Sequence, residues 1–256
     1  MNCFIYDIET VPDVELGRKL YQFDDLDDAG VATAMMFKRQ QETGSEFLPL
    51  HLHKVVAISG VLRRGDSVKV WSLGDIESDE KDIVQRFFDG VERFEPTLVS
   101  WNGSGFDLPV LHYRALHHGI VAARYWETGD DDNRYRYNNY LGRFHWRHTD
   151  LMDVLAAYQP RARASLDQIA TMLGFPGKLG MSGDKVWPTY LAGDLAAIRD
   201  YCESDVLNTY LVYLRFEAMR GRLDAAELAR EEQLLKDLLA ESDKAHWHEF
   251  LQHWQA

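Results

Sequence analysis

The chain opens with an apolar run that ends in two acidic residues, MNCFIYDIET. Aromatic, β-branched and small apolar residues are typical of a strand, and an unbroken apolar run is typical of a strand covered on both faces. Asp7 and Glu9 lie two residues apart, so on a strand their side chains point to the same side. Two carboxylates this close repel each other unless a cation lies between them. The pair indicates either a solvated strand end or part of a site for a hard divalent cation.

The composition favours one large domain with insertions. The 256 residues are 46% hydrophobic, and no Pro/Gly/Ser-rich linker divides them. A formal net charge of −13 argues against a broad electrostatic grip on a long duplex, although a pocket for a few nucleotides remains compatible with it. Cys3 and Cys202 stand in apolar surroundings and are predicted to be free thiols. With no long apolar run and an early Asp7, we expect no membrane span, no signal peptide and a cytoplasmic location.

The next part of the chain predicts an insertion, a hairpin and a helix. The irregular segment 11–50 is expected to be inserted after the first strand, where it could form a lid over a site. Residues 54–62 and 67–73 are predicted to form a hairpin beside the first strand. Residues 78–94 carry apolar side chains on one stripe, which is typical of a helix, and Ser78 can cap its start.

A third carboxylate follows the next strand. Residues 97–101 are short and apolar and run into the glycine-containing loop 102–109, after which Pro109 is expected to start a helix. Asp107 just before that helix can be an ordinary N-cap. It also lies at the carboxyl end of a strand in an α/β sheet, where ligands gather, so it can face a metal ion as well.

The segment 134–148 is aromatic and basic, and it contains no acidic residue. Bases stack on aromatic rings and phosphates meet arginine, so this composition favours contact with single-stranded nucleic acid. A twisted β-hairpin with Asn138 and Asn139 at its turn explains the same pattern. The arginines concerned are Arg134, Arg136, Arg143 and Arg147.

A long helix is predicted over 194–219. Tyr201 and Asp205 are four residues apart on it and therefore share one face. A tyrosine hydroxyl one turn from a carboxylate can orient a water molecule beside a metal ion, although an ordinary surface pair has the same spacing.

Three further features are expected to be structural. Asp150, at a change from strand to helix, is predicted to cap the helix rather than to supply a further carboxylate to a site. Helices are expected over 224–239 and 242–254. His246, His248 and His253 lack a convincing metal-ligand spacing and are expected to lie on a polar helical face.

Three short motifs in this order resemble the DEDD superfamily of 3′–5′ exonucleases. They are Asp7-Ile8-Glu9, the loop from Asn102 to Asp107, and Tyr201 to Asp205, whose tyrosine is typical of the DEDDy branch. The stretches DIETVPD and RDYCESDVLNT look particularly similar to stand-alone proteins related to the exonuclease domain of family B DNA polymerases. The resemblance covers roughly residues 1–216, so we expect an exonuclease domain over 1–220 and a helical extension over 221–256.

This resemblance implies both a fold and a chemistry. The fold would be the α/β ribonuclease H-like one, with a mixed five-stranded sheet flanked by helices. Asp7, Glu9, Asp107 and Asp205 would bind two divalent ions, Mg²⁺ or Mn²⁺, and Tyr201 and Glu9 would help to orient the attacking water. The product would be a nucleoside 5′-monophosphate released from a 3′ end of nucleic acid, and single-stranded ends are the expected substrate. Asn102 and Phe106, with the four arginines of 134–148, are the candidate substrate contacts.

The residues alone leave three other hypotheses about function open. The chain could be a non-catalytic nucleic-acid-binding module on an exonuclease scaffold. The presence of all the motif residues argues against this hypothesis. It could be a metal-dependent phosphatase, against which the aromatic and basic segment speaks. It could also join a larger assembly through its C-terminal helices, which is compatible with catalysis.

Overall fold

The computed structural model describes residues 1–255, and its centre is a mixed five-stranded sheet. The strand order is β3-β2-β1-β4-β5, with β1 in the middle. β1 (Asn2–Pro12) is antiparallel to β2 (His53–Arg64), which is antiparallel to β3 (Ser67–Ser72). On its other side β1 is parallel to β4 (Thr97–Ser100), which is parallel to β5 (His148–Asp150). The predicted mixed sheet of five strands is therefore confirmed.

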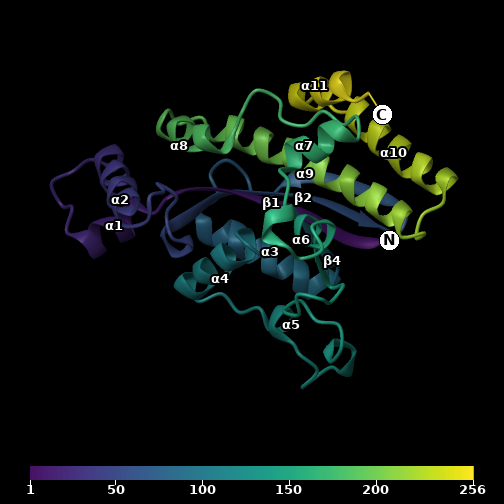
Figure 1. Ribbon diagram of the computed structural model, residues 1–256, viewed down its shortest axis with the longest axis horizontal. Coiled ribbons are helices and arrows are strands. Elements are labelled where there is room, and N and C mark those ends of the chain that lie inside the picture. Colours follow the sequence, from purple (N-terminus) through teal and green to yellow (C-terminus); the bar gives the residue numbers. More distant parts are fainter. Residues whose placement is uncertain (256) are drawn as a thin grey trace.

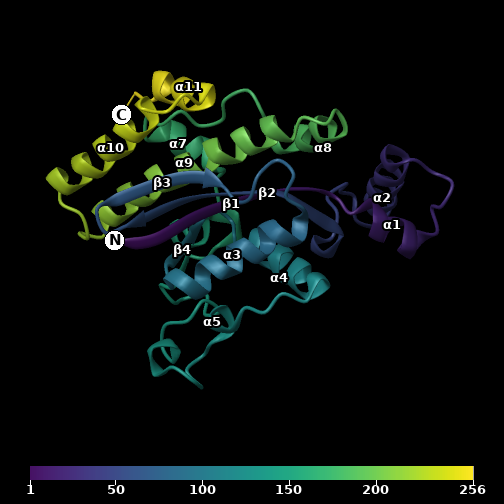
Figure 2. The same ribbon diagram turned by 180° about the vertical axis from the view of Figure 1, so that it is seen from behind.

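Helices cover both faces of this sheet (Figures 1 and 2). One face carries α3 (Glu80–Phe94) and α4 (Asp107–His118). The other carries the long α9 (Leu195–Met219), with α10 (Ala225–Ala240) and α11 (Ala245–His253) packed beside it.

The two faces explain why the start of the chain is apolar without a break. Cys3 and Ile5 belong to the core shared with α9, α10 and α11. Phe4, Tyr6 and Ile8 belong to the core shared with α3 and α4. Successive side chains of a strand point to opposite faces, so a strand buried on both sides needs apolar residues at every position.

The insertion 11–50 forms a helical hairpin that projects beyond the end of the sheet (Figure 1). Its helices are α1 (Val14–Tyr21) and α2 (Asp28–Thr43), with Val31 and Met35 in a small core of their own. The hairpin therefore does not lie over the sheet, but the segment that follows α2 returns to the main body, where Phe47 contacts Phe106 at the start of α4. Shorter elements complete the fold: α5 (Ala123–Trp126), α6 (Leu151–Leu155), α7 (Leu166–Met172) and α8 (Gly183–Leu191), with the 3-10 turns Leu50–Leu52, Asn133–Tyr135 and Pro160–Ala162.

The predictions for the start of α3 and for segment 134–148 were wrong. The N-cap of α3 is Asp79, whose carboxylate accepts a hydrogen bond from the Asp82 amide at 2.8 Å, whereas the Ser78 hydroxyl accepts one from the Asp75 amide in the preceding turn. The segment 134–148 is a 3-10 turn followed by loops rather than a hairpin, until β5 begins. The side chain of Asn138 bonds the backbone amides near the end of this loop, which replaces strand pairing as a partner for those groups.

Glu203 of α9 anchors the C-terminal helix. Its buried carboxylate accepts hydrogen bonds from Ser72 (2.9 Å), Lys244 (2.8 Å), His246 (2.9 Å) and Trp247 (3.0 Å). Burial alone would raise the pKa of Glu203, but the bonds from His246 and Lys244 lower it to about 2. The prediction that His246 lies on a polar helical face was thus wrong, because the ring turns inward to a buried carboxylate.

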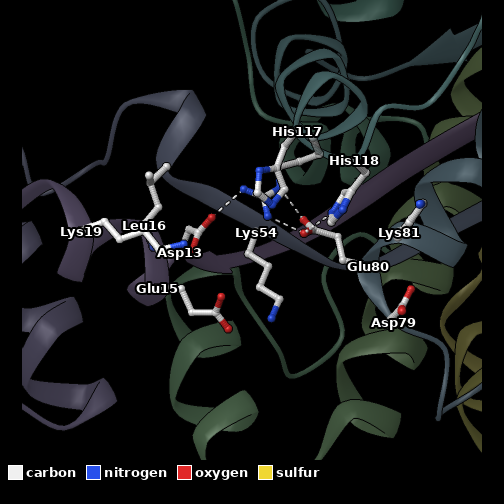
Figure 3. A pocket seen from close by; sticks show the side chains of 11 residues that line it. Asp13, Glu15, Leu16, Lys19, Lys54, Asp79, Glu80, Lys81, His117 and His118 are labelled. Carbon is white, nitrogen blue, oxygen red and sulfur yellow. Dashed lines mark hydrogen bonds and ion pairs between the residues drawn. The ribbon is translucent and has the colours of Figure 1, made fainter.

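A second buried network fixes α4 relative to β1 and α3 (Figure 3). The Arg114 guanidinium contacts Asp13 at 2.6 Å and Glu80 at 2.7 Å. Glu80 also accepts hydrogen bonds from His118 (2.9 Å) and from the Val55 amide (2.6 Å). Because these carboxylates meet donors on several sides, the network can hold buried charge without an unpaired partner.

The expectation for the two cysteines is also met. Both Cys3 and Cys202 are buried free thiols in the described part of the chain. Among residues 1–255, no helix is long and apolar enough to cross a lipid bilayer.

Candidate active site

Asp7 and Glu9 lie in the middle of β1 and point to the same side of the sheet, whereas Ile8 packs into the opposite core. Glu9 is buried and Asp7 is partly buried. The ladder with β2 shifts register between Glu9 and Thr10, which is a β-bulge. Bulges re-aim side chains and are common next to active sites.

Asp107 reaches β1 from α4. It is the first residue of that helix, and the N-cap is Phe106, so the N-cap role predicted for Asp107 was wrong. The buried Asp107 carboxylate accepts a hydrogen bond from the backbone of Ile8, which joins the start of α4 to the strand that carries Asp7 and Glu9.

Tyr201 and Asp205 come to the same place from α9. Their side chains form a hydrogen bond with each other one helical turn apart. The neighbouring Cys202 thiol donates to the Asp7 carbonyl oxygen at 3.4 Å and lies 3.7 Å from its carboxylate. Sequence reasoning missed this thiol, although its position beside Tyr201 offered a signal. The structure thus brings together all five residues singled out for catalysis.

Burial and mutual repulsion perturb the four carboxylates. Burial raises the pKa of Asp107 to about 7 and that of Asp205 to about 6, the latter against the opposing hydrogen bond from Tyr201. The pKa values of Asp7 and Glu9 lie well above their ordinary range, first because of burial and then because of the neighbouring carboxylates. Lys178, exposed on the loop before α8, lowers the pKa of Glu9 and Asp205.

This donor set fits hard divalent cations. Four carboxylates from a strand and two helices offer only oxygen ligands, which Mg²⁺ and Mn²⁺ prefer. The raised pKa values indicate charge that protein groups leave poorly compensated, and a cation would compensate it.

The loop before Asp107 is held by Asp150. Asp150 caps α6, as predicted, through the Asp153 amide, and its two carboxylate oxygens also accept the amides of Asn102 (3.0 Å) and Ser104 (2.9 Å). Asn102 adopts a φ of 66°, and a Cβ on Gly103 would lie 2.2 Å from the Ser100 hydroxyl. Only glycine allows this close approach, so the loop conformation is fixed from several sides.

The arginines proposed to bind substrate already have protein partners. Arg134 pairs with Asp132 at 2.6 Å and with Glu95 at 3.2 Å. Arg143 pairs with the buried Asp153 at 2.9 Å. In addition, the guanidinium of Arg147 lies 3.7 Å from the centre of the Tyr135 ring, and that of Arg136 lies 5.8 Å from the centre of the Tyr137 ring. A substrate phosphate would have to compete with or share these contacts.

The fold and this cluster define an α/β protein of the ribonuclease H-like class with acidic residues converging at its central strand. The chain belongs to the family described as "Predicted 3'-5' exonuclease related to the exonuclease domain of PolB", which its residues 45–254 match. The match includes Asn102, Asp107, Tyr201 and Asp205, whereas Asp7 and Glu9 precede it.

Curated relatives and a solved structure are similar over part of their length. The catalytic chain of DNA polymerase epsilon from Schizosaccharomyces pombe is 26% identical over 150 residues, and that from Saccharomyces cerevisiae is 27% identical over 147 residues. These stretches cover 55% of this chain but only 6% of each relative. The family B DNA polymerase of Pyrobaculum calidifontis aligns with a TM-score of 0.48 and 19% identity, over 82% of this chain and 24% of that one.

Proposed function

We propose that this protein is a metal-dependent 3′–5′ exonuclease that removes nucleoside 5′-monophosphates from the 3′ ends of nucleic acid, preferentially single-stranded ends. The observation that carries the proposal is the convergence of Asp7, Glu9, Asp107 and Asp205 from three elements onto one buried place, with raised pKa values. Membership of a family related to polymerase exonuclease domains supports the same reaction.

The four carboxylates would hold two divalent ions, Mg²⁺ or Mn²⁺. Such a pair supplies an activated water and stabilises both the attacking and the leaving oxygen in an in-line displacement at phosphorus. The protein's own part is to keep the carboxylates at fixed positions: β1 holds Asp7 and Glu9, and the start of α4 holds Asp107 against β1.

Tyr201 and Glu9 would orient the attacking water. Burial keeps the pKa of Tyr201 above the ordinary value, so the hydroxyl stays protonated and donates to Asp205. Its oxygen can then accept a hydrogen bond from the water. Asn102 and Phe106, in the loop fixed by Asp150, would contact the strand that is cleaved.

A digestion time course tests this proposal. Single-stranded DNA and RNA labelled at the 5′ end are incubated with the protein and Mg²⁺ or Mn²⁺, alongside the Asp205→Asn variant and an EDTA control. We expect a ladder that shortens from the 3′ end, with a loss of rate of about 10²- to 10³-fold in the variant, because charge stabilisation at the reacting phosphate is removed. The control variant Asp184→Asn, which changes an exposed carboxylate on α8, should retain the wild-type rate.

Two companion assays, of oligonucleotide binding and of phosphate release, separate the other candidate functions. Binding of the oligonucleotide without shortening in any metal would favour a non-catalytic module. Release of phosphate from small phosphoesters, with the oligonucleotide left intact, would favour a phosphatase. The two buried free thiols support a reducing compartment such as the cytoplasm, and the C-terminal helices remain a proposed contact for a protein partner.

A further inference from the structure

Three rings form a corner in segments next to Glu9 and Asp107 along the chain, and one of them comes from the insertion. Phe47, His53 and Phe106, which we call the aromatic corner, have ring centroids 5.2 to 5.8 Å apart. The Phe106 and His53 rings meet edge to face at 88°, and Phe47 is tilted against both. Phe47 lies between α2 and β2, in the part of the insertion that returns to the main body.

Hydrogen bonds tie the aromatic corner to the strand of the candidate active site. The His53 ring donates through Nε2 to the Leu48 carbonyl oxygen at 3.2 Å, which leaves Nδ1 to accept the Thr10 hydroxyl at 2.9 Å. Thr10 follows Glu9 directly, and Phe106 precedes Asp107 directly. The rings are therefore positioned by the same two segments that position two of the four carboxylates.

Phe47 is exposed although its surroundings are packed. Its exposed fraction is 57%, whereas those of Leu48 and His53 are 4% and 9%. The backbone of Phe47 is also held, because its carbonyl oxygen accepts a hydrogen bond from Arg39 at 3.2 Å. A ring that is fixed in position and open to solvent is suited to receive a flat apolar partner, and unpaired bases are such partners.

We infer that Phe47, together with Phe106, stacks against one of the last two bases of the bound 3′ strand. The inference rests on the proposed exonuclease function and names a specificity-determining residue for it outside the three acidic motifs. A base in a duplex is stacked on its neighbours and paired, so it must leave the helix to reach these rings. The aromatic corner thereby favours unpaired or frayed 3′ ends.

The test compares variants on substrates with and without the stacking base. The variants are Phe47→Ala and Phe47→Leu, the second of which keeps an apolar side chain but removes the ring. The matched control is Phe37→Ala, because Phe37 is 58% exposed on α2 of the same insertion and lies outside the aromatic corner. The substrates are single-stranded oligonucleotides that are intact or carry an abasic residue at the last or the second-last position.

Two readouts are used, so that the inference can fail independently of the proposed function. Binding is measured by fluorescence anisotropy in Ca²⁺, and hydrolysis is measured as kcat/KM in Mg²⁺ or Mn²⁺. For intact strands we expect both Phe47 variants to bind roughly 5- to 150-fold more weakly, since stacking of a base on a protein ring contributes about 1–3 kcal/mol. The loss should disappear on the substrate that is abasic at the stacking position, and Phe37→Ala should match the wild type.

Unchanged binding in both Phe47 variants would overturn the inference, and so would an equal loss on intact and on both abasic strands, because neither depends on a base. If the wild type hydrolyses no strand, the proposed function fails, and the anisotropy data still decide whether Phe47 contacts a base. If hydrolysis is normal and only the stacking effect is missing, the exonuclease proposal stands without the aromatic corner.

Discussion

Two groups of acidic residues lie along β1 and just after its end. The charges of one group are paired with a protein cation, and those of the other group are not. Asp13, just after the strand, shares Arg114 with Glu80 in contacts of 2.6 and 2.7 Å. Asp7 and Glu9, within the strand, face further carboxylates that raise their pKa values. The first arrangement stabilises the fold by satisfying its charges, whereas the second leaves charge for a ligand to compensate. The difference separates structural acids from candidate catalytic ones more clearly than burial does, because both groups contain buried side chains.

The largest loss of stability is expected when the arginine that pairs with Asp13 and Glu80 is removed. Arg114→Met leaves Asp13 and Glu80 buried without their cation, and should lower the free energy of unfolding by about 3–5 kcal/mol. The measurement is urea denaturation followed by circular dichroism. The control Arg86→Met, which removes an exposed pair with Asp82 on α3, should cost no more than about 1 kcal/mol. Equal losses in the two variants would mean that the buried network contributes no more than a surface pair.

A metal ion that binds the cluster around Asp7 and Glu9 should increase the stability of the fold. Mn²⁺ at about 100 times its dissociation constant should stabilise the fold by about 2.7 kcal/mol, because it binds the native cluster and not the unfolded chain. Thermal unfolding with Mn²⁺ and with EDTA measures this gain. The gain should largely vanish in Asp7→Asn, and an undiminished gain in that variant would place the metal elsewhere.

A smaller effect of opposite sign is expected from neutralising one acid of this cluster. Without metal, Asp107→Asn removes a repelled, buried charge and should stabilise the protein by about 1 kcal/mol while abolishing hydrolysis. Chemical denaturation in EDTA at pH 8, where the wild-type carboxylate is ionised, gives the comparison. A destabilised variant would show that the hydrogen bond from Ile8 to the carboxylate outweighs the repulsion.

The last test is the dependence of stability on pH. A carboxylate whose pKa is higher in the folded than in the unfolded state binds more protons when folded, so stability is greatest at low pH and declines as the pH rises. For Asp107 and Asp205, with pKa values of about 7 and 6, the decline should run from about pH 4 to pH 7. Thermal unfolding in EDTA from pH 5 to pH 8 should show it, and the double variant Asp107→Asn/Asp205→Asn should reduce it, with the remaining decline due to Asp7 and Glu9, whose pKa values are also raised. The pKa of Glu203, lowered to about 2, makes no contribution in this range.

The sequence allowed good predictions where a local pattern decides the structure. The apolar run before Asp7 predicted a central strand because burial on both faces leaves a continuous pattern, and Asp150 was recognised as a helix cap from its position alone. The order of the three motifs predicted the five-stranded sheet through resemblance to a known family.

The failures concern residues whose partners are distant in sequence. His246 bonds Glu203 across 43 positions, and no periodicity in its own helix shows that. The segment 134–148 has hairpin-like composition, but side-chain bonds from Asn138 and buried tyrosines hold it as a loop. Phe47 was missed for the same reason, because its contact with Phe106 is not visible in the sequence.

The long helix α9 has a consequence for how the protein withstands thermal motion. One continuous rod of 25 residues carries Tyr201 and Asp205 on one side, and Glu203, two positions before Asp205, on another. Lys244, His246 and Trp247 clamp that rod through Glu203. A tilt of the rod would displace Asp205 from the acids of β1 and would pull on this clamp at the same time. Contacts from α11 and the residue before it therefore help to keep Asp205 in position relative to β1, although these contacts lie on the other side of α9.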